Sequence, residues 1–233
     1  MATAPSDAND LTASAVPNSA LSLVKFFVLA YAMTWACWIP VVAASRPLRA
    51  IGYSFWLLGT LAPSIVALAL TARDEGKRGV RALVARTLQW RVSVGWYVFA
   101  VSYILSLKLI VAVVHRLVIG EWPPFGNEAP VLMLFATLIS TPVQSGEEVG
   151  WRGYALPRLA ECIGYRAGAV VLGILWACWH LPQFFLTAAD TYRQSFPVWS
   201  LQVIALSVAM AWLYTRTQGS LLLMMHFRCR LRW

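Results

Sequence analysis

Two adjacent glutamates and a nearby arginine form the group of residues in this chain that is best suited to chemistry. Glu147 and Glu148 follow an apolar run, and Arg152 comes four positions after Glu148. An ionisable group at membrane depth is costly, so such carboxylates are functional candidates. On a helix Glu148 and Arg152 share a face and can pair, whereas Glu147 points about 100° away. The spacing indicates that Glu147 acts on water as a general base; taken alone, it also fits an interfacial helix start, where the dipole favours acidic side chains.

Two of the three histidines also lie in apolar runs. His180 follows Trp176 by four residues and comes just before Pro182, and His226 ends the string Leu-Leu-Leu-Met-Met. A single histidine on an apolar face is more often a packing residue than a ligand. Together with the glutamate pair, however, His180 and His226 can hold a metal ion with Glu147 or donate hydrogen bonds to an oxyanion. Both readings stay open at this point.

The elements that must position these side chains are membrane helices. The chain has 233 residues, of which 59% are hydrophobic and 12% charged, against about 45–50% and about 25% in a typical soluble domain. The long apolar runs predict an all-α, polytopic membrane helical bundle of about six to seven transmembrane helices. The last run is too short to cross a bilayer, so we expect a truncated C-terminal helix. The runs cover residues 23–44, 53–71, 94–119, 131–146, 167–186, 198–214 and 220–233.

The charge of the chain predicts its orientation. A net charge of +9 would suggest nucleic acid in a soluble protein, but here the basic residues gather between apolar runs. The positive-inside rule therefore places the arginine-rich loop 73–91 and the N-terminus in the cytoplasm. We expect the lipid bilayer as a partner and no nucleic acid. Residues 1–22 are polar and predict a disordered cytoplasmic tail, followed by a single transmembrane domain over 23–233.

Three motifs, taken together, resemble the CPBP family (CAAX protease and bacteriocin-processing, also called ABI), which is related to the type II CAAX prenyl endopeptidase. They are Glu147-Glu148-x-x-x-Arg152, then Trp176-x-x-x-His180, then His226. The longer string Glu-Glu-Val-Gly-Trp-Arg-Gly-Tyr-Ala-Leu-Pro-Arg-Leu over 147–159 is similar to bacterial members. The resemblance covers about residues 130–230. The second motif has Trp176 where phenylalanine is usual.

The resemblance implies an intramembrane endopeptidase of the bacterial cytoplasmic (inner) membrane. Glu147 would activate water, with Glu148 and Arg152 in support. His180 and His226 would hold either zinc, together with Glu147, or the developing oxyanion. The substrate would be a membrane-associated or prenylated peptide or protein, and the resemblance names neither that substrate nor the oligomeric state.

One departure from the family pattern supports an alternative. The third motif usually has asparagine or another small polar residue four places after the histidine, whereas this chain has Arg230 there, in a strongly basic end. The alternative is a non-catalytic membrane protein: a bacteriocin self-immunity member, a scaffold, or a damaged copy of the protease. A transporter is a third reading, although no paired broken helices occur in two halves of the chain.

Overall fold

The computed structural model of this protein describes residues 15–44, 50–123 and 146–229, and every regular element within these ranges is helical. Four helices are long and apolar enough to cross a membrane: Ser19–Ala43, Ile51–Thr87, Val149–Phe185 and Phe196–Arg216. The predicted all-α, polytopic helical bundle is therefore confirmed. The predicted run 131–146 falls largely outside the described residues.

The helices follow the apolar runs closely where the runs are long. Helix α4 spans Val94–Ile119, the same bounds as its run, and α7 spans Phe196–Arg216. The last described helix, α8, covers Leu221–Cys229 and lies within the final apolar run. Helix α2 spans Ala15–Ala43 and so begins before residue 22, where the sequence predicts that the tail ends.

The arginine-rich segment differs from its prediction as a loop. Helix α3 covers Ala50–Thr87, with a bend at Gly76 where φ is 64° and ψ is −160°. The segment after the bend is therefore helical through Thr87, and only residues beyond it form the connection to α4. The prediction of a loop over the whole segment was wrong because high charge density reports exposure to water, which a surface helix satisfies as well as a loop.

A reversal at Gly164 folds the segment from η1 (Val149–Ala155) to the end of α6 (Leu156–Trp179) into a hairpin. The π-helix η1 runs directly into α6, in which Gly164 has φ 80° and ψ 157°. Beyond Gly164 the chain returns alongside itself. The rings of Trp151 and Trp179 lie 5.5 Å apart, and the guanidinium of Arg152 lies 4.1 Å from the ring centre of Trp176.

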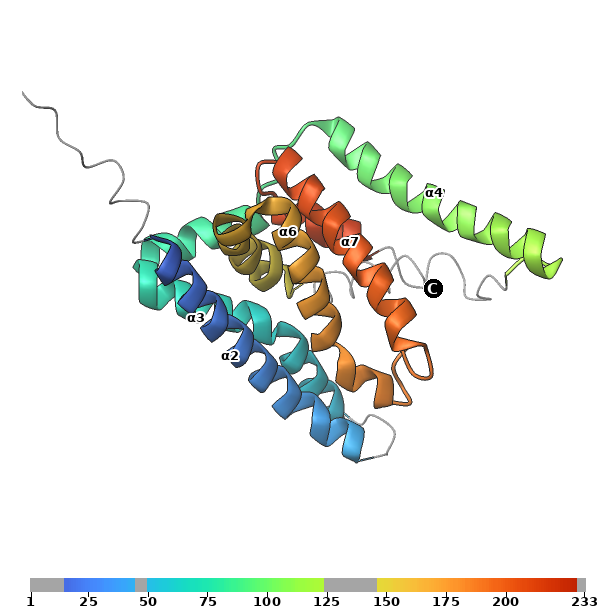
Figure 1. Cartoon of the computed structure of the whole chain (residues 1–233), viewed down its shortest axis with the longest axis horizontal. Coiled ribbons are helices and arrows are strands. Elements are labelled where there is room, and N and C mark those ends of the chain that lie inside the picture. Colours follow the sequence, from blue (N-terminus) through green and yellow to red (C-terminus); the bar gives the residue numbers. More distant parts are fainter. Residues whose placement is uncertain (1–14, 45–49, 124–145, 230–233) are drawn as a thin grey trace, which may run out of the picture.

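Close backbone packing joins this hairpin to α2 and α3 (Figure 1). The Thr34 hydroxyl of α2 donates to the Gly59 carbonyl of α3 at 2.9 Å. A methyl group placed on Gly150 of η1 would lie 2.6 Å from the Pro63 carbonyl of α3. Such contacts let apolar helices approach without bulky side chains between them, as membrane helices do.

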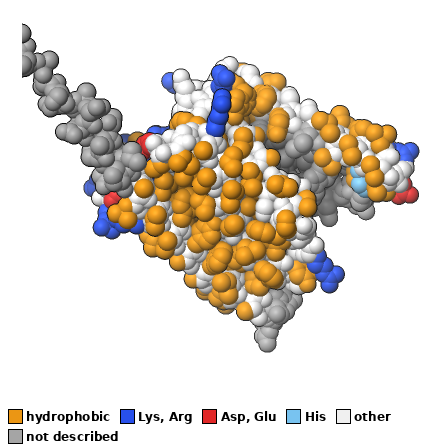
Figure 2. Space-filling model, viewed as in Figure 1, with side chains coloured by type: hydrophobic (Ala, Val, Ile, Leu, Met, Phe, Trp, Pro, Cys, Tyr) orange, Lys and Arg blue, Asp and Glu red, His pale blue; other side chains and the backbone are white. Residues whose placement is uncertain are grey.

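Helix α7 packs on the returning leg of α6, and α4 extends away from the bundle in Figure 1. The Ser207 hydroxyl of α7 donates to the Ala169 carbonyl at 2.9 Å. The first turns of α4 contact α7, since Trp96 and Phe99 both meet the Trp212 ring. Figure 2 shows a broad face of hydrophobic side chains with most of the visible lysines and arginines near its margins, as expected of a surface against lipid.

Candidate functional site

The glutamate pair lies buried where the chain enters the π-helix. Exposure is 1% for Glu147, 0% for Glu148 and 0% for Arg152. The entry is tied to α3, because the Ser64 hydroxyl donates to the Gly146 carbonyl just before the pair. Single π-helical turns are rare and frequently occur at functional sites. Three ionisable groups without access to water require strong mutual compensation.

Glu148 and Arg152 supply part of that compensation by pairing, as their spacing predicts. Arg152 Nη1 lies 3.0 Å from Glu148 Oε2 and 3.1 Å from Oε1. The flat face of Trp176 covers the same guanidinium at 4.1 Å, so a cation–π contact adds to the ion pair. The pair thus forms a neutral unit inside the bundle.

Glu147 points away from this pair, also as predicted, and meets two tryptophans. The indole Nε1 of Trp151 donates to Glu147 Oε2 at 2.7 Å. The indole Nε1 of Trp176 donates to the same oxygen at 2.8 Å. Two N–H donors on one carboxylate oxygen compensate for part of the lost hydration of the charge.

His180 lies one helical turn beyond Trp176, in an aromatic enclosure. Its exposure is 6%, and its ring centre lies 4.6 Å from that of Trp179 and 5.0 Å from that of Trp199. The ring Nδ1 lies 2.7 Å from the Trp176 carbonyl oxygen. Because a carbonyl only accepts, Nδ1 carries the proton, and the neutral ring has its lone pair on Nε2.

The end of α6 makes this contact possible. The helix ends at Trp179, and the short 3-10 helix η2 (Leu181–Phe185) follows, with Pro182 at its start. The backbone N–H of His180 therefore donates to Ala177 rather than to Trp176, its partner in a regular α-helix. The Trp176 carbonyl is thus available to the imidazole. Pro182 has no backbone N–H and cannot continue the α-helical hydrogen bonding, which is consistent with the end of α6 at this point.

The third predicted member, His226, lies in α8, but its side chain is outside what the structure describes. The start of α8 does reach the site element, because a methyl group on Gly153 of η1 would lie 3.0 Å from Leu221 Cδ1. Among the described residues, no three potential ligands cluster as a metal site would require. The predicted trio of Glu147, His180 and His226 therefore stays a prediction.

Sequence reasoning missed the two tryptophans as partners of Glu147. Trp151 stands four residues after Glu147, just as Arg152 follows Glu148, so the same spacing rule would have found it. The sequence places Trp176 four residues before His180, at a position where the family usually has phenylalanine. Nothing in the sequence indicates that its N–H reaches Glu147, which lies 29 residues away.

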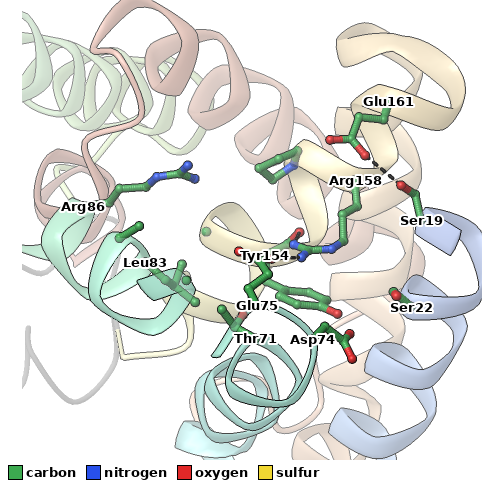
Figure 3. A pocket seen from close by; sticks show the side chains of 14 residues that line it. Ser19, Ser22, Thr71, Asp74, Glu75, Leu83, Arg86, Tyr154, Arg158 and Glu161 are labelled. Carbon is green, nitrogen blue, oxygen red and sulfur yellow. Dashed lines mark hydrogen bonds and ion pairs between the residues drawn. The ribbon is translucent and has the colours of Figure 1, made fainter. Parts of the chain in front are cut away.

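A polar pocket of about 360 Å³ lies beside the site element, where α2, α3 and α6 meet (Figure 3). The Ser19 hydroxyl of α2 donates to Glu161 of α6 at 2.8 Å. Arg158 of α6 pairs with Glu75 of α3 at 2.7 Å. The pocket thus gathers the N-terminal part of α2, the basic part of α3 and the segment after η1. The charge pattern predicts the first two of these on the cytoplasmic side of the membrane.

Two comparisons show which known proteins this chain is similar to. Residues 127–229 match the family model described as "Type II CAAX prenyl endopeptidase Rce1-like". The chain is also 21% identical over 220 residues to a "CAAX prenyl protease 2" from Methanococcus maripaludis, a match that covers 87% of this chain and 79% of the relative. Both matches support the resemblance to the CAAX protease family that the three motifs indicate.

Proposed function

We propose that this integral membrane protein is an intramembrane endopeptidase in which Glu147 activates water. The proposal starts from the similarity of the chain to CAAX proteases. One observation carries the proposal: a buried carboxylate is held by two indole N–H groups next to a separately neutralised ion pair. A purely structural acid would be expected at an exposed helix end, where the dipole and water both stabilise it. A buried carboxylate with directed donors instead fits a general base.

In the proposed step Glu147 takes a proton from water as the water oxygen bonds to the carbonyl carbon of the scissile peptide. The proton then passes to the leaving nitrogen as the C–N bond breaks. The products are a carboxylic acid and an amine. Glu148 and Arg152 support the step by holding η1 and Trp176 in place.

His180 suits the metal alternative better than the oxyanion alternative in its neutral form. Its Nδ1–H donates to the Trp176 carbonyl oxygen. The neutral ring therefore has a lone pair at Nε2 and cannot donate a hydrogen bond from that atom. Metal-bound histidines commonly direct their other ring nitrogen to a carbonyl in this way. An oxyanion donor would require the imidazolium.

In the metal alternative of this proposal, zinc would be held by Glu147, His180 and His226. The donor chemistry of the two described residues fits, because zinc takes carboxylate oxygen and imidazole nitrogen. When bound, zinc would polarise a carbonyl or lower the pKa of a bound water.

We further propose that the substrate is a membrane-associated or prenylated peptide or protein, in line with the names of the matched family and relative. The apolar exterior in Figure 2 would let such a substrate approach through the bilayer. The proposed location is the cytoplasmic membrane of a bacterium, with the N-terminus and the pocket of Figure 3 on the cytoplasmic side.

The test is cleavage of a prenylated, membrane-tethered peptide by the purified full chain in lipid. We expect wild type to cleave and Glu147→Gln to be inactive, because the amide cannot accept the proton. Glu121→Gln is the matched control, since Glu121 is exposed just after α4. Equal rates for wild type and Glu147→Gln would exclude Glu147 as the base. A cellular protection phenotype that survives Glu147→Gln would favour the non-catalytic alternative.

A further inference from the structure

Two tryptophans share the task of holding one oxygen of the proposed base. We propose that Trp151 and Trp176 are positioning residues, whose indole N–H groups fix the place and rotation of the Glu147 carboxylate for its reaction with water. The inference rests on the proposed function, because it assigns a role within the same site. The geometry behind it is the convergence of both Nε1 atoms on Oε2, at 2.7 and 2.8 Å.

Two donors on one oxygen restrict how the carboxylate can turn. A carboxylate oxygen accepts more than one hydrogen bond. The two short N–H donors on Oε2 come from different elements, Trp151 from η1 and Trp176 from α6, so together they hold the carboxylate against rotation.

Trp151 is rigid enough to serve as a fixed donor. It is fully buried, and its ring meets Phe26 edge-on at 5.5 Å. Trp179 meets it edge-on from the opposite leg of the hairpin, also at 5.5 Å. These contacts come from α2 and α6, so the indole direction is set by elements far from it in sequence.

Trp176 couples the proposed base to the neighbouring ion pair. Its N–H contacts Glu147, its face carries Arg152 at 4.1 Å, and its carbonyl accepts the ring N–H of His180. One residue thus contacts three of the predicted site residues through three different atom groups. Such support keeps a catalytic group within the small tolerance that efficient reaction requires.

Replacement of each tryptophan by phenylalanine tests the contribution of the indole N–H separately from that of the aromatic ring. Trp151→Phe and Trp176→Phe keep an aromatic ring for the contacts with Phe26 and Arg152 but remove the donor to Oε2. We expect each variant to lower kcat roughly 10- to 100-fold, the size of one hydrogen bond to a charged group, and to change KM less than about threefold. Trp96→Phe, at the remote contact between α4 and α7, is the matched control and should keep wild-type kcat.

A second pair of variants guards against a loss of structure. Trp151→His and Trp176→His restore a ring N–H and should recover part of kcat relative to phenylalanine, at similar thermal unfolding midpoints. Wild-type kcat in both phenylalanine variants would overturn the inference, as would equal loss in the phenylalanine and histidine variants. Failure of the proposed function is distinct: it would appear as activity in Glu147→Gln, whatever the tryptophan variants do.

Discussion

The indole Nε1 of Trp176 lies 2.8 Å from Oε2 of Glu147, although 29 residues separate them in the chain. The hairpin that reverses at Gly164 brings the two together, because it lays the end of α6 back against the start of η1. The same reversal places Arg152 under the Trp176 ring and Trp151 against Trp179. The site therefore depends on one tight turn in the segment that runs from η1 through α6.

The first prediction concerns this turn. Gly164 has φ 80° and ψ 157°, a region that is open essentially to glycine alone. Gly164→Ala should destabilise the fold by about 1–3 kcal/mol and lower peptidase activity, as measured by unfolding in detergent and by cleavage. Gly120→Asn is the control: Gly120 caps α4 with φ 89° and ψ −7°, a left-handed conformation that asparagine tolerates. A Gly164→Ala variant as stable as wild type would contradict the role of the turn.

The second prediction concerns the buried ion pair. Arg152→Met leaves the Glu148 carboxylate buried without its paired cation and should cost about 3–5 kcal/mol of unfolding free energy. Combining it with Glu148→Gln should restore much of that loss, because no uncompensated charge remains. Glu75→Gln breaks the exposed pair with Arg158, where the carboxylate side chain is 49% exposed, and should cost at most about 1 kcal/mol. Similar losses from the buried and the exposed pair would refute this account.

The third prediction concerns the seat of η1 on α3. Gly150→Ala places a methyl group 2.6 Å from the Pro63 carbonyl, so η1 must move away from α3. We expect a loss of about 1–3 kcal/mol from overpacking, together with reduced activity, since Glu147 and Arg152 would move with η1. Gly95→Ala, where the nearest atom would be Ser93 Oγ at 3.8 Å, should leave both unchanged. An active, stable Gly150→Ala protein would show that the close approach is dispensable.

The fourth prediction concerns zinc. The purified protein should contain about one zinc ion per chain if Glu147, His180 and His226 form the site, as measured by elemental analysis. His180→Ala should contain much less zinc by the same elemental analysis, a readout that does not require activity. His115→Ala should keep it, because His115 instead contacts the backbone carbonyl of Glu121 at 3.0 Å. Full activity in exhaustively metal-stripped protein would exclude the zinc proposal.

The fifth prediction concerns the departure from the family's third motif. Arg230 stands four positions after His226, and a cation there opposes a bound metal ion. Arg230→Asn, the residue usual in the family, should raise zinc affinity roughly threefold or more and raise activity with it. Arg232→Asn serves as the control for charge alone. Unchanged affinity in Arg230→Asn would mean that this arginine points away from the site.

The positions of the long helices and the contact of Glu148 with Arg152 could be predicted from the sequence, because both depend on residues close together in the chain. The run 94–119 became α4, because a long apolar run predicts a helix of matching length. The contact of Glu148 with Arg152 followed from spacing within one turn. By contrast, helical character in the segment beyond Gly76 was missed, because its charge was read as a loop. The side chain of His226 and the run 131–146 are not described, so their predictions stand untested.

What the sequence determined by itself is the all-α membrane architecture and the buried acidic motif, because hydrophobic length and short-range spacing decide them. What the tertiary structure decided is the environment of Glu147. Its oxygen meets Trp176 only because Gly164 adopts backbone angles that reverse the chain, and no residue near Glu147 encodes that reversal. The orientation of His180 has a similar origin, since the end of α6 frees the carbonyl that receives its ring N–H. Such contacts depend on where distant segments pack, and periodicity carries no information about that.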